Sequence, residues 1–204
     1  RRHSSAASDV YKRQDNYDNA IIFIGGDIAH AKTEMSPELI HQISSFFREC
    51  SKLHPTIVIA GNHDCNLNNP DRLDVLSPIM DMMDDENLFY LKNSGVYKIG
   101  DVAVSVFSIL DDADNYISGL DIDDPTIKTK IAVYHGSVKR SMTDIGYVVM
   151  GGDIELPMFN GYDIVMLGDI HKHQVLQEYQ SEHKFISEDK VDEYKLKGWC
   201  LADD

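Results

Sequence analysis

Six side chains that can bind a metal ion or transfer a proton directly follow short apolar runs of this sequence. No cysteine accompanies them: they are Asp27, Asn62, His63, His135, Asp169 and His171. Carboxylate, amide and imidazole groups suit Mn²⁺, Fe²⁺, Zn²⁺ or Mg²⁺, whereas softer metals prefer thiolates. Two such ions about 3.5–4 Å apart can clamp a phosphate and lower the pKa of a bridging water. The set therefore indicates metal-assisted phosphate chemistry, with Asp27 as the natural bridging carboxylate.

Apolar runs rich in β-branched and aromatic residues lead into these side chains. Each run ends at a glycine beside Asp, Asn or His, and the runs are residues 20–24, 56–60, 130–134 and 162–167. They predict buried strands. Interleaved with helices, such strands are typical of a layered α/β fold, in which ligands gather at the carboxyl ends of the strands. We therefore expect the six polar side chains to meet at one edge.

Helices and further strands are predicted between these runs. Ser36 is the predicted N-cap of a helix with proline in its first turn. Apolar residues recur on one face of that helix, and Phe46 and Phe47 are expected to pack in the core. Residues 71–83 predict a second helix, which Pro78 would kink or break. The remaining expectations are strands at 88–91, 96–99 and 102–109, an acidic loop at 111–124, and a hairpin at 175–179.

Length and composition fit one globular domain. The chain has 204 residues, 43% hydrophobic and 26% charged. No apolar run approaches the ~20 residues of a membrane span, and no apolar stretch follows the basic N-terminus as in a secretory signal. The three cysteines form no disulfide or zinc pattern. We expect an intracellular protein, cytoplasmic or nuclear, without a membrane partner.

The formal net charge of -15 weighs against a nucleic-acid ligand, since such ligands normally need a basic surface. Two divalent cations would offset about four of those charges. The acidity therefore counts against a DNA substrate but does not exclude it.

Four motifs occur in a fixed order: GGDIAH at 25–30, GNHD at 61–64, YHGSV at 134–138 and LGDIHKHQ at 167–174. In this order they resemble the motifs of the calcineurin-like metallophosphoesterases. The GD-x-x-H form of residues 26–30 and the stretch 146–174 resemble the Mre11/SbcD DNA-repair nucleases. The similarity covers roughly residues 20–180.

This resemblance implies a layered α-β-β-α sandwich and a phosphodiesterase that uses two divalent ions, with Mn²⁺ preferred over Mg²⁺, Fe²⁺ or Zn²⁺. By the resemblance, Asp27 would bridge the ions, while Asn62, His135 and Asp169 would complete one site and His171 would serve the other. Residues 20–204 would form the phosphoesterase domain, and residues 1–19 a disordered or non-native leader.

The resemblance also implies roles in catalysis. His63 would contact the scissile phosphate or protonate the leaving oxygen. Asp64 would orient His63, and His30 would help to place the substrate. DNA is the implied substrate, in repair or processing, and an SMC-like Rad50/SbcC ATPase is the implied partner.

Two departures from the family pattern stand out. The family opens with Asp-x-His on its first strand, and nothing in this sequence fits that motif. We therefore expect a missing first strand, a chain truncated at both ends, and one metal site too poor in ligands for full activity. The last motif is normally Gly-His-x-His, but Asp169 replaces its first histidine. Aspartate still binds hard ions and would shift the preference towards Mn²⁺ or Mg²⁺.

Other interpretations stay open. The chain could act on phosphoproteins, nucleotides or small phosphate esters, or it could be a scaffold without catalysis, which the missing Asp-x-His would favour. The acidic loop lacks the ligand order of an EF-hand, so a solvated loop is the expected state. The roles of His30 and His173 are left undecided, whereas surface or core positions are expected for His3, His41, His54 and His183.

Overall fold

The computed structural model describes residues 20–30, 35–69, 72–152 and 154–176. The predicted leader, residues 1–19, and the end of the predicted 175–179 hairpin lie outside these residues. Residues 175 and 176 belong to no strand. No helix among the described residues is long and apolar enough to cross a membrane.

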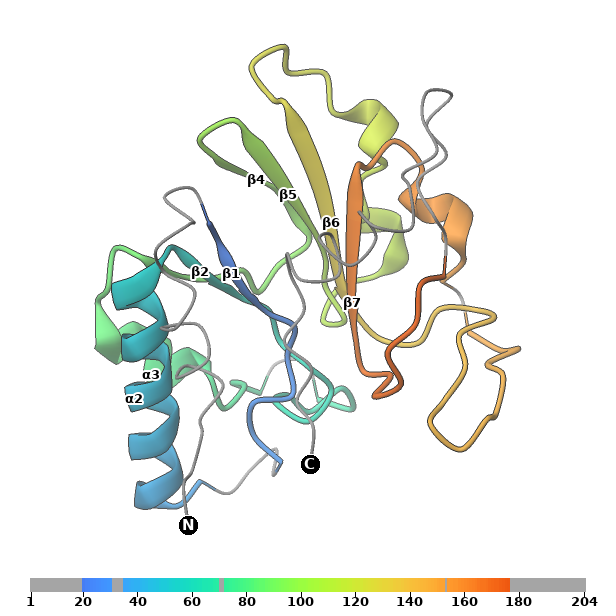
Figure 1. Ribbon diagram of the computed structural model, residues 1–204. Helices are drawn as coiled ribbons and strands as arrows, with labels where there is room; N and C mark the ends of the chain where they lie inside the picture. Colours follow the sequence, from blue (N-terminus) through green and yellow to red (C-terminus); the bar gives the residue numbers. More distant parts are fainter. Residues whose placement is uncertain (1–19, 31–34, 70–71, 153, 177–204) are drawn as a thin grey trace, which may run out of the picture.

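The first sheet is parallel and small. Its strands are β1 (Ile22–Ile24), β2 (Thr56–Val58) and β3 (Leu88–Tyr90), in the order β1-β2-β3. The register pairs Ile24 with Val58, the last residues of β1 and β2. The segments that follow these two strands therefore leave the sheet side by side, which brings the first two motifs together (Figure 1).

The second sheet carries the other two motifs. It contains β4 (Gly95–Ile99), β5 (Val102–Phe107), β6 (Thr129–His135) and β7 (Ile164–Gly168), in that order. Only β4 runs antiparallel to its neighbour; β5, β6 and β7 are parallel. His135 is paired with Gly168, so the carboxyl ends of β6 and β7 also lie together.

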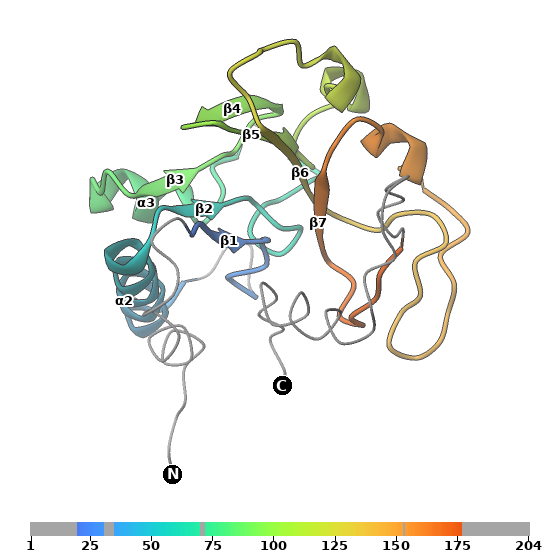
Figure 2. The same cartoon turned by 45° about the horizontal axis from the view of Figure 1, so that its top comes forward.

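Two helices cover the outer face of the first sheet (Figures 1 and 2). Helix α2 spans Pro37–Leu53, and the backbone N–H of Leu39 donates to the Ser36 hydroxyl at 3.1 Å, which confirms the predicted N-cap. Helix α3 spans only Ser77–Met83.

The predicted helix over 71–83 is wrong in its first half. Proline has no backbone N–H and suits the first turn of a helix, so Pro78 lies in the first turn of α3 and does not bend a longer helix. Asp74 fixes the same boundary, because its Oδ1 accepts from the backbone N–H groups of Leu76 at 3.0 Å and Ser77 at 2.8 Å.

Apolar side chains fill three layers. Phe47, Val58 and Leu76 pack between the helices and the first sheet. Ile57 and Val133 pack between the two sheets. A third cluster lies on the outer face of the second sheet, where Phe107 and Phe159 are in ring contact at 5.1 Å. Short 3-10 turns cover this face: η2 (Ala113–Asn115), η3 (Gly119–Asp121) and η4 (Leu156–Phe159). The expected α/β sandwich of two sheets is confirmed.

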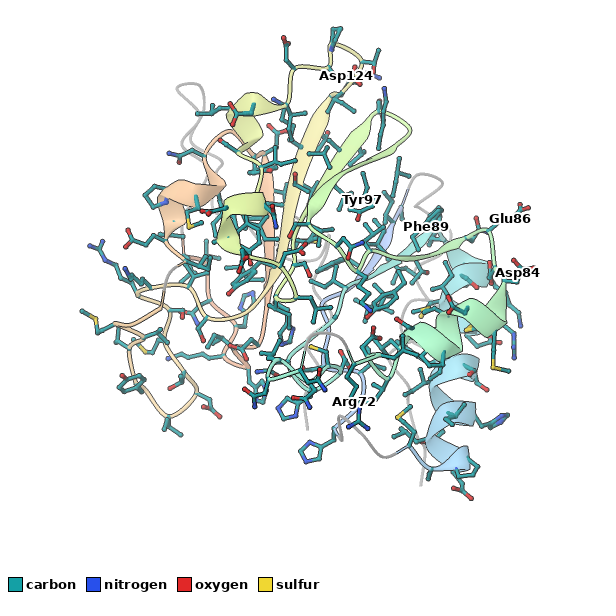
Figure 3. The ribbon with its side chains drawn as sticks, turned by 180° about the vertical axis from the view of Figure 1, so that it is seen from behind. Arg72, Asp84, Glu86, Phe89, Tyr97 and Asp124 are labelled. Carbon is teal, nitrogen blue, oxygen red and sulfur yellow. The ribbon has the colours of Figure 1, made fainter. Side chains whose placement is uncertain are left out.

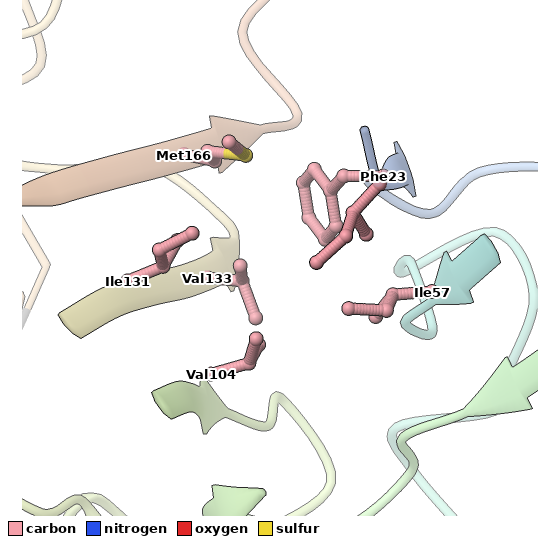
Figure 4. Close-up of a pocket in the computed structure, with 7 residues that line it drawn as sticks. Phe23, Ile57, Val104, Ile131, Val133 and Met166 are labelled. Carbon is pink, nitrogen blue, oxygen red and sulfur yellow. The ribbon is translucent and has the colours of Figure 1, made fainter. Parts of the chain in front are cut away.

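The layer between the sheets is not completely filled. An apolar pocket of about 40 Å³ lies there, with Phe23 and Ile57 facing it from the first sheet and Val104, Val133 and Met166 from the second (Figure 4). The pocket offers water almost no polar partner.

Candidate metal centre

The two sheets bring their strand ends together in one site. His135, the last residue of β6, places Nε2 at 3.3 Å from Oδ1 of Asp27, which follows β1. Asn62 follows β2, and its Nδ2 donates to Oδ1 of Asp169, directly after β7, at 3.4 Å. Residues from four strand ends thus meet at the edge expected from the motifs, and the contact between Asn62 and Asp169 joins positions 107 residues apart in the sequence.

Close backbone approach makes this meeting possible. A Cβ atom at Gly61 would overlap the backbone nitrogen and Oδ1 of Asp27. Gly26 has φ +93°, and a Cβ there would lie 2.6 Å from the Gly61 nitrogen and 2.7 Å from His135 Nδ1. Glycine is therefore required at both positions, because any side chain would separate the segments that carry the polar groups.

Two aspartates of the site have left-handed backbone conformations. Asp27 has φ 57° and Asp169 has φ 81°. Non-glycine residues adopt such angles at a cost, and they are concentrated at functional sites. Each aspartate comes directly after a glycine at or just beyond the end of a strand, Asp27 after Gly26 and Asp169 after Gly168. The turn at each position directs the carboxylate across the strand ends.

His135 is buried and holds its ring between Gly25 and Asp27. Its side chain is 2% exposed, and Nδ1 lies 2.5 Å from the Gly25 carbonyl oxygen, which can only accept. The ring proton is therefore on Nδ1, and Nε2 carries a lone pair. Nε2 is buried without a hydrogen-bond partner among the described residues, and it faces an oxygen of Asp27. Two lone pairs that face each other at 3.3 Å leave a natural place for a cation.

Asn62 supplies a second buried atom of the same kind. Its Oδ1 is buried and also lacks a hydrogen-bond partner among the described residues. An amide oxygen and an imidazole nitrogen left unpaired beside a carboxylate are suitable ligands for a hard divalent cation. In the described part of the chain, no three His, Cys, Asp or Glu side chains form a metal cluster by themselves. A ligand set at this place would therefore need the amide of Asn62 in addition to Asp27 and His135.

Asp169 has both carboxylate oxygens engaged. Oδ1 accepts from Asn62, and Oδ2 accepts from the hydroxyl of Ser137 at 2.9 Å. Ser137 was not among the residues predicted from the sequence. Its position two residues after His135, within the YHGSV motif, is the signal that could have revealed it.

His63 lies beside this group. Its backbone N–H donates to Asp27 Oδ1 at 2.9 Å. Its ring stacks on the ring of His30, with centroids 5.3 Å apart and planes inclined by 15°. Its Nδ1 lies 3.3 Å from the His30 carbonyl oxygen. His30 therefore fixes the position of the His63 ring.

The role predicted for Asp64 needs correction. Asp64 is fully buried, and its two oxygens accept from the backbone N–H groups of Ala29 at 2.8 Å and Gly61 at 2.9 Å, not from the ring of His63. Burial raises the pKa of this carboxyl, although the two hydrogen bonds act in the opposite direction. Asp64 joins the segments after β1 and β2, and His30 takes the place beside His63.

His171 is not brought into the group. Its side chain is exposed and makes no hydrogen bond or ion pair with the other described residues. The structure therefore joins Asp27, Asn62, His63, His135 and Asp169, and leaves His171 apart.

A cleft of about 510 Å³ opens beside the group. Its walls include Asn62, His135 and Asp169 on one side and the segment 109–116 with Asp111 and Asp112 on the other. Burial raises the pKa of Tyr116, which also lines the cleft, to about 12. The acidic and aromatic lining was not predicted as part of the site.

A two-sheet α/β fold with cation ligands at its strand ends defines a class of metal-dependent phosphoester hydrolases. This chain belongs to the calcineurin-like phosphoesterase family, whose model matches residues 4–199. Members of the family generally use two divalent metal ions. The family indicates hydrolysis of a phosphoester bond.

The chain is also similar to a viral protein. It is 42% identical over 185 residues to the uncharacterized protein R555 of Acanthamoeba polyphaga mimivirus. The matched region is 87% of this chain but 13% of that relative, so the chain spans a small part of the length of the protein it resembles.

Proposed function

We propose that this protein is a metal-dependent phosphodiesterase that cleaves DNA in the manner of the Mre11/SbcD nucleases. The observation that carries the proposal is the presence of two buried, unpartnered atoms at the strand ends: His135 Nε2, which faces the carboxylate of Asp27, and Asn62 Oδ1, whose amide contacts Asp169. Leaving such atoms unpaired is costly, and a bound cation would remove that cost.

Asp27, Asn62 and His135 would hold one ion. The family resemblance alone assigns the other ion to Asp27 and His171, because the exposed His171 makes no hydrogen bond or ion pair with the group among the described residues. When bound, two divalent ions activate a water molecule and stabilise the charge that develops on the phosphate. Mn²⁺ is proposed on the ground of the family resemblance, since oxygen and imidazole ligands suit all the candidate metals.

His63 would donate a proton to the leaving oxygen. Its Nδ1 faces the His30 carbonyl, so Nε2 is the ring atom available to a substrate. The stacked ring of His30 limits rotation of the donor and would help to place the phosphate beside it. The cleft of about 510 Å³ is of the size that accommodates a small organic ligand such as a nucleotide.

DNA as substrate is supported by the resemblance of residues 146–174 to the Mre11/SbcD stretch. A Rad50/SbcC-like ATPase is the partner proposed on the same ground. One observation favours a second candidate, a phosphoesterase acting on small esters: Asp111 and Asp112 line the cleft and would repel a polyanion.

Calorimetric titration with Mn²⁺ and three hydrolysis assays would test the proposal. The substrates are linear DNA, bis-p-nitrophenyl phosphate as a small diester, and p-nitrophenyl phosphate as a monoester. We expect tight binding of about one Mn²⁺ ion and only weak Mn²⁺-dependent cleavage of DNA, both lost in His135→Ala. Cleavage of the small esters but not of DNA would favour the second candidate, and Mn²⁺ binding without any hydrolysis would favour a scaffold.

A further inference from the structure

We propose that Asp169 is a positioning residue that acts through Asn62, in contrast to the ligand role expected from the sequence. It would fix the amide of Asn62 so that Oδ1 faces the metal position. This inference rests on the metal centre proposed above.

The carboxylate decides which way the amide points. An ionised carboxylate only accepts hydrogen bonds, whereas an amide offers a donor on one side and an acceptor on the other. Asn62 presents Nδ2 to Asp169 Oδ1 at 3.4 Å, which is long for a hydrogen bond. The reversed amide would set its oxygen against the carboxylate oxygen, so repulsion enforces the observed orientation even at this distance. Oδ1 of Asn62 is consequently turned away from Asp169, where it is buried and unpaired.

The carboxylate of Asp169 is itself fixed by its surroundings. Ser137 donates to Oδ2 at 2.9 Å, and the backbone at Asp169 is in the left-handed conformation that aims the side chain. With one oxygen bound to Ser137 and the other to Asn62, the carboxylate is fixed in one orientation before any ion arrives. Ser137, Asp169 and Asn62 thus form a relay that links the ends of β6, β7 and β2.

A double-mutant cycle on Mn²⁺ affinity separates the two roles. Calorimetry with MnCl₂ would compare the full chain with Asn62→Ala, Asp169→Ala and the double variant. We expect Asp169→Ala to weaken binding about 10- to 100-fold, the usual effect of losing a residue that orients a ligand. The double variant should bind like Asn62→Ala, within about twofold, because Asp169 has nothing left to orient. A further loss equal to that of Asp169→Ala alone would show a direct ligand and overturn the proposal.

A conservative variant provides a second test that does not depend on measuring very weak binding. Asn tolerates the left-handed backbone, and in Asp169→Asn the new amide can accept from Asn62 and donate to Ser137. A positioning role predicts affinity within about fivefold of wild type. A loss as large as that of Asp169→Ala would overturn the proposal, because it would show that the charge itself binds the ion.

Serine variants supply the matched control. Ser137→Ala should weaken Mn²⁺ binding, whereas Ser141→Ala should leave it unchanged, since the Ser141 hydroxyl donates to the Val138 carbonyl in the same segment and does not reach Asp169. Equal effects of the two variants would contradict the relay. If the wild-type chain binds no Mn²⁺ under any condition, both the metal centre and the positioning role of Asp169 are refuted. If the wild-type chain binds Mn²⁺ but the effects of the two alanine substitutions add, only the positioning role is refuted.

Discussion

One oxygen of Asp27 meets two groups of opposite character. The backbone N–H of His63 donates to Oδ1 at 2.9 Å, whereas Nε2 of His135 turns a lone pair towards the same oxygen at 3.3 Å. The first contact positions the segment after β2, and the second is tolerable only with positive charge nearby. The two histidines beside Asp27 differ in exposure: Nε2 of His135 is buried, whereas the ring of His63 is partly exposed.

This difference in exposure predicts that substitutions of the two histidines affect turnover and Mn²⁺ affinity differently. His63→Ala or His63→Asn should lower turnover by about 10²-fold or more, because a proton donor to the leaving oxygen is lost. Mn²⁺ affinity should not change, since the His63 ring is not among the buried unpartnered atoms beside Asp27. Single-turnover kinetics and calorimetry check the two expectations, and loss of metal binding in His63→Ala would make His63 a ligand.

At the scale of elements, the site depends on how closely the segments after β1 and β2 approach. Gly61→Ala should reduce both stability and Mn²⁺ affinity, because the added methyl would overlap Asp27 and push the two segments apart. Gly151→Ala is the control: an added Cβ there meets no described atom within 4 Å. Thermal melting with and without MnCl₂ measures both effects, and an unchanged melting temperature in Gly61→Ala would show that the segments can move apart freely.

The start of α3 depends on one buried charge. Asp74 is 2% exposed, and it binds Lys92 Nζ at 2.8 Å, the Tyr90 hydroxyl at 3.0 Å and the Ser77 hydroxyl at 2.6 Å. Burial alone would raise the pKa of this carboxyl, but the bonds from Lys92 and Ser77 outweigh it and hold the pKa below its usual range. The stabilisation is therefore complete above the unfolded pKa of about 3.9 and is lost as pH falls through the lower folded pKa.

Asp74→Asn tests this linkage. We expect a loss of about 3 kcal/mol in the free energy of unfolding at pH 7, because Lys92 loses its charged partner. The difference from wild type should narrow in strong acid, where Asp74 is protonated. Urea unfolding at several pH values measures this difference in the free energy of unfolding. Asp101→Asn removes the exposed ion pair with Lys128 and should change stability little. A constant difference at all pH values would contradict the assignment.

At the scale of the whole molecule, the excess of acidic residues is not confined to the site. Asp124, in the acidic loop, lies at the opposite end of the molecule from Arg72, which follows β2 (Figure 3). Its carboxylate lies 2.9 Å from Lys98 Nζ, and both side chains are exposed, which agrees with the solvated loop expected from the sequence. Asp124 is far from the strand ends, so salt screens its charge and it adds little to the repulsion that a phosphate ester would meet there.

The sequence predicted most of the residues that share the site but not which hydrogen bonds they make. The motifs predicted Asp27, Asn62 and His135 at one edge because parallel strand ends must share an edge. They could not predict the partners of Asp64 or Asp169, because each carboxylate is close to several donors and only the folded backbone selects among them. The 71–83 helix failed for a related reason: apolar spacing continued through residues whose N–H groups bind the side chain of Asp74.

The unfilled space between the sheets makes hydrostatic pressure a sensitive variable for this protein. The pocket of about 40 Å³ is partly open, so its loss on unfolding would contribute at most on the order of 20 mL/mol to the volume decrease. Val133→Ile should fill part of the pocket, stabilise the fold by about 1 kcal/mol and raise the pressure at which half the molecules are unfolded. High-pressure fluorescence would measure that midpoint. Val175→Ile, at an exposed position, is the control, and a lower midpoint for Val133→Ile would mean that the pocket walls cannot accommodate another methyl group.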